Sequence, residues 1–342
     1  MTVSEPTPAG IVTLSNVAAH AGVSLATASR AINGSARIVN PEMTERVLKS
    51  ARQLGYSANA QAQAVARGST RTVAVILGDI ADPYFSAIAS GVIDEAAKND
   101  LVVTMWATGS VPDRLLATLA AMRSQRPQAV IIAQSAQRGD EVESPVTAEL
   151  AALQRAGTAV CTIGSAPGSF TRVLVDNAGA TSELARALVD RGYSRFLVLA
   201  GDPELRTPAE RAAGFVAGLQ ERGVDPVSVI TGGFSRSGAF ETMTGALESG
   251  LRPDCVFAVT DVMALGVLSA LREAGIVPGT EIGVAGFDDI DAVRDVTPAL
   301  TTVAIPLAEL GAEALRATLG IAARIESIVG TVVLRESTPV RN

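Results

Sequence analysis

From residue 71 onward the chain alternates short apolar runs with longer amphipathic segments, and this alternation constrains the fold more than any other feature. Near-continuous apolar strands separated by helices are typical of parallel sheets whose two faces are both covered. The number of runs exceeds what one compact sheet needs, so we predict an α/β body of two doubly wound lobes, with crossovers near Val175, Asp289 and Val332. The predicted strands are residues 72–77, 101–105, 129–132, 158–163, 173–175, 196–200, 227–231, 255–259, 282–286 and 301–303, and the predicted helices are residues 86–99, 114–123, 178–191, 208–222, 239–249 and 262–274.

Residues 13–33, by contrast, have the pattern of two short helices joined by a tight turn. Ser15 is placed to cap the first helix, and Ser24 to cap a second helix over residues 25–32. Gly22 falls where the first helix must stop, and glycine reaches φ > 0 without steric cost, which suits a turn between steeply angled helices. In a helix-turn-helix the second helix enters the major groove of DNA. An Ala-rich helix pair with one glycine is also compatible with ordinary packing, so this segment alone leaves both interpretations open.

The next residues favour DNA binding. Asn40 as cap and Pro41 at the first helical position predict a third helix to about Leu54, ended by Gly55. Its expected inner stripe is Met43, Val47, Ala51 and Leu54. Residues 1–71 hold seven Lys/Arg and three acidic residues, a net charge of +4, whereas the remainder carries −11. A small basic head on an acidic body is expected when only the head meets phosphate.

The second helix supplies the candidate DNA contacts. Arg30 is the residue best able to make a bidentate contact with guanine, whereas short hydroxyl side chains suit phosphate. The candidates in the head are Leu14, Ser15, Ser24, Leu25, Ala26, Thr27, Ser29, Arg30, Asn33 and Arg37. Residues 59–67 are helix-prone but have too little apolar surface to fold alone, so we expect them to order on binding.

Composition narrows the class of protein. With 48% hydrophobic and 18% charged residues, the 342-residue chain is typical of a well-packed globular protein of two or three domains. The apolar runs have strand length, too short to span a membrane. The first ten residues lack the basic and apolar regions of a secretory signal, and Cys161 and Cys255 lie in apolar runs where buried, reduced thiols are expected. We therefore predict a cytoplasmic protein.

Polar and aromatic residues gather where the predicted strands end. In open α/β sheets ligands bind beyond the carboxyl ends of the strands, here in the cleft between the two lobes. Aromatic faces together with Asp and Arg suit a neutral polyhydroxy ring. Any one of these residues could instead be a helix cap or a surface charge, Asp261 above all. Asp82, Ser235 and Asp289 also lie at these strand ends. The candidates for effector binding are Asp79, Tyr84, Phe85, Trp106, Ser165, Thr207, Arg211, Phe234, Thr260, Asp261, Phe287 and Asp288.

Catalytic groups are poorly represented. The only histidine, His20, lies in the head, so a Ser-His or Cys-His pair cannot form in the body. There is no His/Cys cluster for a transition metal and no Gly-x-x-x-x-Gly-Lys phosphate loop. Asp288 and Asp289 are adjacent at a strand end, where neighbouring carboxylates usually point apart. We expect no enzymatic activity, metal or cofactor.

Together these motifs resemble the lactose-repressor/galactose-repressor (LacI/GalR) family of transcriptional regulators over nearly the whole chain. The head motif is Val17-Ala-x-x-Ala-Gly-Val-Ser-x-x-Thr-x-Ser-Arg30. Further matches are Asn40-Pro-Glu, Leu54-Gly-Tyr, Asp82-Pro-Tyr-Phe, Val175-Asp-Asn, Arg211-Ala-Ala-Gly-Phe, Asp261-Val-Met-Ala-Leu-Gly, Val284-Ala-Gly-Phe-Asp-Asp and Pro298-Ala-Leu-Thr-Thr.

The resemblance implies a ligand-responsive repressor that binds a pseudo-palindromic operator as a homodimer. It implies base contacts from Leu25, Ala26 and Arg30, and a hinge helix over residues 59–66 whose apolar side chain kinks DNA at the minor groove. That hinge adds Asn59, Val65 and Ala66 to the DNA-binding candidates. A small sugar-like effector would bind at Tyr84, Phe85, Arg211, Phe234, Asp261 and Asp288. The chain departs from the family at Ala58, Val65 and Thr260, where proline, leucine and asparagine are common.

These features give the expected domain organisation. Residues 1–11 are a disordered N-terminus, 12–58 the DNA-binding domain, 59–71 hinge and linker, and 72–342 the two-lobed body. Lobe 1 takes about residues 72–174 and 300–331, and lobe 2 about 175–289 and 332–342. With no trailing leucine heptad, a dimer is expected rather than a tetramer. The main alternative function is a sugar-binding protein that serves a transporter, and the missing signal peptide and the basic head argue against it.

Overall fold

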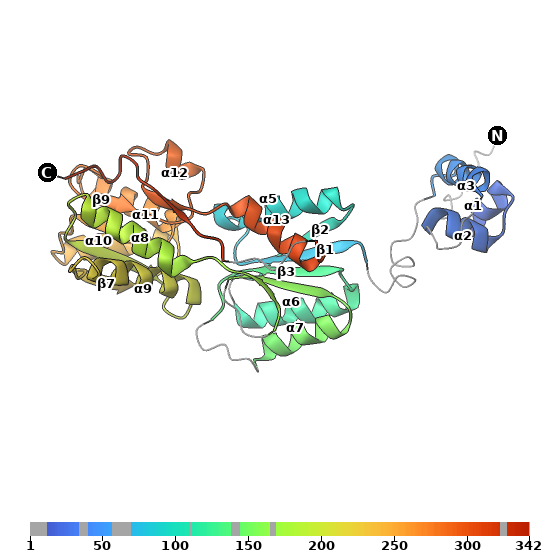
Figure 1. Ribbon diagram of the computed structural model, residues 1–342, viewed down its shortest axis with the longest axis horizontal. Helices are drawn as coiled ribbons and strands as arrows, with labels where there is room; N and C mark the ends of the chain where they lie inside the picture. The colour runs from blue at the N-terminus through green and yellow to red at the C-terminus, as the bar shows by residue number, and fades with distance from the viewer. Residues whose placement is uncertain are drawn as a thin grey trace, which may run out of the picture. The chain divides into compact units, whose positions relative to one another are not determined.

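The computed structural model describes residues 12–33, 40–56, 70–109, 111–137, 144–164, 169–321 and 327–341. The chain forms two compact units, Met1–Thr70 and Arg71–Asn342 (Figure 1). The described part of the first is all helical, and the second is α/β with two parallel sheets. The predicted fold class is therefore confirmed. Among the helices of the described residues, none combines the length and the hydrophobicity that a membrane span requires.

The head packs three helices, α1 (Leu14–Ala21), α2 (Leu25–Asn33) and α3 (Pro41–Gln53), around a small core. Gly22 has φ 65°, in the left-handed region, as the tight turn requires. Ser24 caps α2, because its Oγ accepts from the backbone N–H of Thr27 at 3.1 Å. The buried core side chains are Val17, Ala18, Ala21, Ala28, Val47 and Ala51.

Two details of the predicted head are wrong. The cap of α1 is Thr13 rather than Ser15: Thr13 and Asn16 form a reciprocal capping box, in which Asn16 Oδ1 accepts from the Thr13 N–H at 2.8 Å. Met43 is 40% exposed and does not belong to the inner stripe of α3, where Ser50 is buried instead. Helix α3 begins at Pro41, so Met43 lies in its first turn, which extends beyond the core.

Lobe 1 is built on a five-stranded parallel sheet of order β2-β1-β3-β4-β5. Helices α5 and α13 cover one face, and α6 and α7 cover the other (Figure 1). The strands are β1 (Thr72–Leu77), β2 (Val102–Ala107), β3 (Ala129–Ala133), β4 (Ala159–Ile163) and β5 (Thr171–Val173). The helices are α5 (Pro83–Lys98), α6 (Pro112–Gln125), α7 (Pro145–Arg155) and α13 (Leu307–Thr318).

Lobe 2 is built on a four-stranded parallel sheet of order β7-β6-β8-β9. Helices α8 and α9 pack against each other, as do α10 and α11. The strands are β6 (Phe196–Gly201), β7 (Ser228–Thr231), β8 (Cys255–Ala258) and β9 (Gly283–Ala285). The helices are α8 (Asn177–Asp190), α9 (Arg206–Gln220), α10 (Arg236–Glu248), α11 (Asp261–Glu273) and the short α12 (Ala292–Asp295).

Three chain segments connect the lobes (Figure 1). Two of them form an antiparallel pair, β10 (Thr302–Ala304) with β11 (Thr331–Val333). The third passes through Val175, which makes a parallel bridge to Ile328. Residues before β10 bond to lobe 2, where the Gly286 N–H donates to the Thr301 carbonyl at 2.9 Å. The lobes are thus joined by three adjacent strand-like segments.

Helices α7, α12 and α13 were not predicted from the sequence. The moderate apolar content of α7 and the four-residue length of α12 give weak periodic signals. Helix α13 has a clear apolar face, and its buried side chains pack against α5 and the first sheet. Its position after β10 in the chain places it in lobe 1, far from its sequence neighbours in lobe 2.

Helix α13 lies against α5 at unusually short range, because a glycine stands at each crossing point. A Cβ on Gly91 would overlap the backbone carbonyl of Ala308, and one on Gly311 would overlap that of Ile88. The α8/α9 pair repeats this arrangement with Gly214. Helix spacing in both lobes therefore depends on glycine.

We expect Gly91→Ala to lower the free energy of unfolding by about 1–3 kcal/mol, because the added methyl group meets rigid backbone. Gly245→Ala is the matched control: Gly245 is also inside a helix, but a Cβ added there would meet nothing within 4 Å. That variant should gain about 0.5–1 kcal/mol from helix propensity. Urea unfolding of both variants checks this, and equal effects would contradict the close-packing argument.

Candidate functional site

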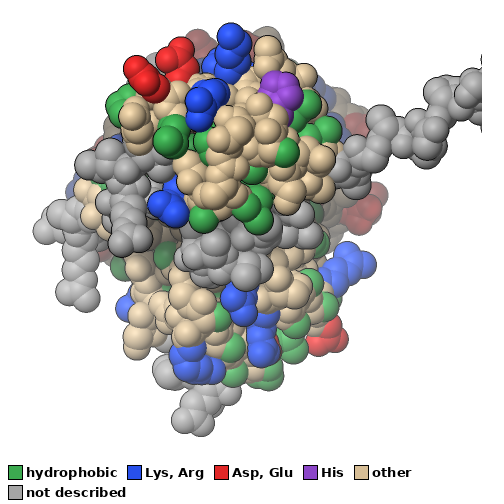
Figure 2. Space-filling model, turned by 90° about the vertical axis from the view of Figure 1, so that its right-hand side faces the viewer, with side chains coloured by type: hydrophobic (Ala, Val, Ile, Leu, Met, Phe, Trp, Pro, Cys, Tyr) green, Lys and Arg blue, Asp and Glu red, His purple; other side chains and the backbone are tan. Residues whose placement is uncertain are grey.

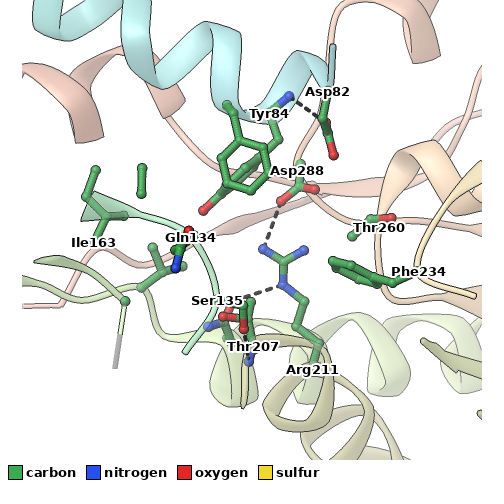
Figure 3. Close-up of a pocket in the computed structure, with 15 residues that line it drawn as sticks. Asp82, Tyr84, Gln134, Ser135, Ile163, Thr207, Arg211, Phe234, Thr260 and Asp288 are labelled. Carbon is green, nitrogen blue, oxygen red and sulfur yellow. Dashed lines mark hydrogen bonds and ion pairs between the residues drawn. The ribbon is translucent and has the colours of Figure 1, made fainter. Parts of the chain in front are cut away.

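A cavity of about 580 Å³ lies between the lobes, at the carboxyl ends of strands from both sheets (Figure 3). Lobe 1 supplies residues that follow β1, β3 and β4, and lobe 2 supplies residues from α8, α9 and the ends of β7, β8 and β9. The lining residues are Asp82, Tyr84, Phe85, Ala133, Gln134, Ser135, Ile163, Gly164, Val175, Asn177, Thr207, Arg211, Phe234, Thr260 and Asp288. This is the cleft position that the strand ends predicted.

The first turn of α5 places the aromatic pair. Asp82 caps the helix, since its Oδ1 accepts from the Tyr84 N–H at 2.9 Å, and Pro83 occupies the first helical position. The rings of Tyr84 and Phe85 meet edge to face with centroids 5.0 Å apart. Burial raises the pKa of Asp82 and that of the Tyr84 phenol. The Tyr84 hydroxyl therefore stays protonated and can donate or accept.

Arg211 and Asp288 form the charged centre of the cavity (Figure 3). Arg211 Nη2 lies 2.9 Å from Asp288 Oδ1, and both side chains are buried. The guanidinium is also fixed by Nε donating to Asn177 Oδ1 at 3.0 Å and by Nη1 donating to the Val259 carbonyl at 3.0 Å. Its carbon lies 3.9 Å from the centroid of the Phe287 ring. The arginine is thus held rigidly, with its charge presented to the cavity.

Asp288 keeps acceptor capacity despite this ion pair. Its Oδ1 is close to the guanidinium but is not aligned with an N–H for a hydrogen bond. Burial raises the pKa of Asp288, whereas the adjacent Arg211 opposes this shift and favours the ionised form. Its backbone has φ 117°, a strained value for a residue with a side chain, and such strain gathers at functional sites. Asp288 is therefore available to bond a ligand hydroxyl.

The neighbouring carboxylate points elsewhere. Asp289 pairs with Arg335 at 2.6 Å and with Arg294 at 2.9 Å, at the segments that connect the lobes. Asp288 and Asp289 therefore do not form a convergent carboxylate pair, as expected for adjacent residues.

Four predicted ligand residues do not line this cavity, and a fifth, Ser165, lies outside the described residues. Asp79 is exposed and accepts from the Ala81 N–H at 2.9 Å, as a turn residue. Trp106 packs on the apolar cluster under α6 and α7. Phe287 lies behind Arg211 and supports it. The strand ends brought these residues near the cleft, but the side-chain directions turned them away.

Asp261 is the fourth, and its role is structural in this geometry. It is fully buried, accepts from Thr302 Oγ1 at 2.6 Å and from the Ile290 N–H at 3.0 Å, and so ties α11 to the connecting segment. The cap of α11 is the neighbouring Thr260, whose Oγ1 accepts from the Met263 N–H at 3.3 Å. Thr260 does line the cavity.

Sequence reasoning missed Gln134, Ser135 and Asn177 as cavity residues. Ser135 links the lobes, since its Oγ accepts from the Thr207 N–H at 3.0 Å. Asn177 is buried at the first position of α8 and positions Arg211. Gln134 and Ser135 follow β3, and Asn177 follows the crossover at Val175. Both positions lie at the same edge of the cleft, and this placement is the sequence signal that could have identified the three residues.

The pKa of Asp261 gives a pH prediction. Burial raises it to about 6, so the folded chain binds this proton more tightly than the unfolded chain does. The stability that this proton contributes is complete below about pH 4 and is lost as the pH rises through 6. The Asp261→Asn side chain does not titrate. The free energy of unfolding of this variant, relative to that of the wild type, should therefore increase by about 1–3 kcal/mol as the pH rises from 4 to 6. Thermal unfolding across that range measures the difference, and a constant difference would contradict it.

The predicted DNA-contact residues lie mainly on α2. Leu25 is 52% exposed and Ala26 is exposed, whereas Thr27, Ser29 and Arg30 are half-buried. In the upper part of Figure 2, where the histidine is visible, Lys and Arg side chains lie among uncharged ones and acidic side chains gather at one edge. Leu14 is half-buried, and Ser15 and Ser24 are exposed. The Asn33 side chain and Arg37, Asn59, Val65 and Ala66 lie outside the described residues.

Comparison with known proteins assigns the family. The family model "Bacterial regulatory proteins, lacI family" matches residues 13–59, and "Periplasmic binding protein-like domain" matches residues 185–338. The HTH-type transcriptional regulator GalS of Salmonella typhimurium is 31% identical over 324 residues, covering 94% of this chain and 93% of that protein. The chain belongs to the LacI family. The transcriptional repressor CytR of Escherichia coli K12 is 30% identical over 306 residues, covering 89% and 87%.

A solved structure agrees with the fold of this LacI-family chain. The Lac repressor dimer bound to operator and the anti-inducer ONPF has a TM-score of 0.82 at 24% identity, covering 96% of this chain and 99% of that one. The helix-turn-helix head and the periplasmic-binding-protein-like body are thus both confirmed, and the chain is a DNA-binding transcriptional regulator.

Proposed function

We propose that this LacI-family protein is a repressor whose affinity for operator DNA is controlled by a small polyhydroxy effector in the cavity between the lobes. The Arg211–Asp288 pair carries the proposal. A rigid buried donor and a buried acceptor side by side match the vicinal hydroxyls of a sugar ring, which donate and accept together.

The remaining lining residues fit the same class of ligand. Phe234 lies across the cavity from Gln134 and Ile163 (Figure 3). An aromatic face of this kind packs against the apolar C–H face of a sugar, while the polar side chains hold its edge. The effector residues we propose are Tyr84, Phe85, Thr207, Arg211, Phe234, Thr260 and Asp288, together with Gln134 and Asn177.

The connection between the lobes gives the control mechanism. The lobes are joined by three adjacent strand-like segments, and they also touch at the rim of the cavity, where the Arg206 N–H donates to the Ala136 carbonyl at 2.9 Å. An effector that binds one relative arrangement of the lobes more tightly shifts the population toward it. The affinity for DNA then changes by the same differential free energy.

The DNA-bound form would be a homodimer on a pseudo-palindromic operator. The Lac repressor dimer is solved bound to its operator, which supports this arrangement for a relative of the same fold. The proposed DNA contacts are those of α2, with Arg30 as the main polar reader, and the hinge over residues 59–66. The proposed domain limits are 12–58, 59–71 and 72–342.

The test is binding of the full-length protein to the promoter region that flanks its own gene, measured by fluorescence anisotropy. Binding should exceed that to a scrambled duplex, should weaken as salt rises from about 50 to 200 mM, and should change when a matching sugar or nucleoside is added. Equal affinity for both duplexes would refute the repressor assignment. Sequence-specific binding that no sugar or nucleoside alters would refute the effector class alone.

A further inference from the structure

A second cavity, of about 640 Å³, adjoins the proposed effector cavity. It lies in lobe 1, between the ends of β3 and β4 and the first turns of α6 and α7. Gln134, Ser135 and Ile163 line both cavities. The two spaces are therefore neighbours with a common wall, which is formed by Gln134, Ser135 and Ile163.

The walls of the second cavity are chemically unlike those of the first. Leu115, Ile132, Val146 and Leu150 give it aliphatic surfaces, and among its described lining residues there is no Lys, Arg, Asp or Glu. The first cavity, by contrast, contains the Arg211–Asp288 pair. An ionised group would leave water here without a counter-charge, so the second cavity suits a neutral and mostly apolar group.

The polar atoms of the second cavity still point to a ligand. Thr162 is 3% exposed, and its Oγ1 is buried without a hydrogen-bond partner among the described residues. Such groups are rare in folded proteins, because an unpaired buried hydroxyl is costly. Gln134 is oriented by Thr108, whose Oγ1 donates to Gln134 Oε1 at 2.6 Å, so the amide N–H₂ remains to donate.

The N-termini of α6 and α7 also favour a ligand with hydrogen-bond acceptors. Pro112 and Ser144, at the N-termini of α6 and α7, both line the second cavity. The partial positive charge of a helix N-terminus favours hydrogen-bond acceptors nearby. Together with the Gln134 amide and the Thr162 hydroxyl, it defines a site for a flat ring with acceptor atoms at its edge and apolar faces.

We propose that the effector has two parts: a hydroxylated ring held by Arg211 and Asp288, and a flat, mostly apolar ring with at least one acceptor that occupies the second cavity. This inference rests on the proposed function. A nucleobase has this chemistry, and a plain aryl group shares its shape. A second sugar fits poorly, since its many hydroxyls would face aliphatic side chains.

The experiment compares matched probes on the full-length protein by isothermal titration calorimetry. The pairs are D-ribose with uridine, and D-galactose with phenyl β-D-galactoside. In the pair whose sugar fits, the two-ring probe should bind at least about tenfold more tightly, because it buries a further ring. Trp106 is the only tryptophan and packs on the same apolar cluster as Val146, so its fluorescence should respond to the two-ring probe more than to the sugar.

Two variants localise the effect. Val146→Phe fills the second cavity and should remove the tenfold gain while leaving the affinity for the free sugar unchanged. The control Val277→Phe, at an exposed site, should change neither. Thr162→Val keeps the shape and removes the hydroxyl, so it should weaken uridine severalfold and phenyl galactoside little, which distinguishes a base from an aryl group.

Sugar binding without a gain for the two-ring probe would overturn the second site and leave the proposed function standing. The same conclusion would follow if Val146→Phe weakened the binding of the sugar and of the two-ring probe equally. If none of the four probes binds, the polyhydroxy effector class fails, and this inference fails with it.

Discussion

Replacing Asp288 with alanine is expected to lower the free energy of unfolding by about 3–5 kcal/mol and to abolish the response to effector. The cost arises because Arg211 would be left buried without its counter-charge. The effector would also lose a buried acceptor, which typically weakens binding by a factor of about 100 or more. DNA binding without effector should persist, because Asp288 belongs to the body and not to the head.

Chemical unfolding and effector titration measure these two effects. Asp288→Asn keeps an oxygen near Arg211, so it should recover part of the stability. Asp291→Ala is the matched control, since Asp291 is fully exposed and lies 3.9 Å from Arg294; its loss should be close to neutral. The division of labour between head and body would be wrong if Asp288→Ala lost operator binding while still folded.

Replacing Arg30 with alanine is expected to reduce the preference for operator over scrambled DNA by roughly 10- to 100-fold, the usual value of one bidentate guanine contact. Arg30 is on α2, where the neighbouring Leu25 and Ala26 offer no hydrogen bonds to base edges. No other polar reader of comparable reach stands on that helix among the described side chains. Effector affinity should be unchanged.

Anisotropy titrations at two salt concentrations separate this role from simple charge. Lys49→Ala is the control, because Lys49 is an exposed cation on α3. It should weaken operator and scrambled duplexes alike and reduce the salt dependence by about one counterion. If Arg30→Ala behaves in the same way as Lys49→Ala, Arg30 contacts phosphate and does not read bases.

Helices, turns and strands were predicted correctly from the sequence where the residues that determine them are close together in the chain. Gly22, Ser24 and Asn40 fix turns and caps through their own backbone and short side chains, so the head could be outlined from sequence. Apart from β11, which was not predicted as a strand, the strands of the body were placed within a residue or two, because buried strands are continuous apolar runs. Met43 and Ser15 show the limit of prediction from local patterns. A periodic pattern fixes neither the residue at which a helix begins nor how far its first turn extends beyond the core.

Identifying the residues of the cavity required the fold as well as the local sequence. Tyr84, Arg211 and Phe234 were identified because strand ends converge in this architecture, and that convergence follows from parallel topology alone. Whether a strand-end side chain faces the cavity depends on its own direction: Asp288 turns inward to Arg211, whereas Asp289 turns to Arg335. Adjacent residues with the same chemistry thus serve different purposes, and no sequence pattern separates them.

The order of the amino acids was enough to specify a basic helix-turn-helix head, a two-lobed α/β body and a binding edge with aromatic, acidic and basic groups. These features depend on periodicity, capping and charge, which act over a few residues. Three-dimensional packing was needed to establish that Asp261 holds α11 to the connecting segment, that Gln134 stands between two cavities, and that Thr162 has no hydrogen-bond partner among the described residues. Those facts depend on contacts between segments 26 or more residues apart, such as Thr108 with Gln134, and such contacts form only when the chain has packed.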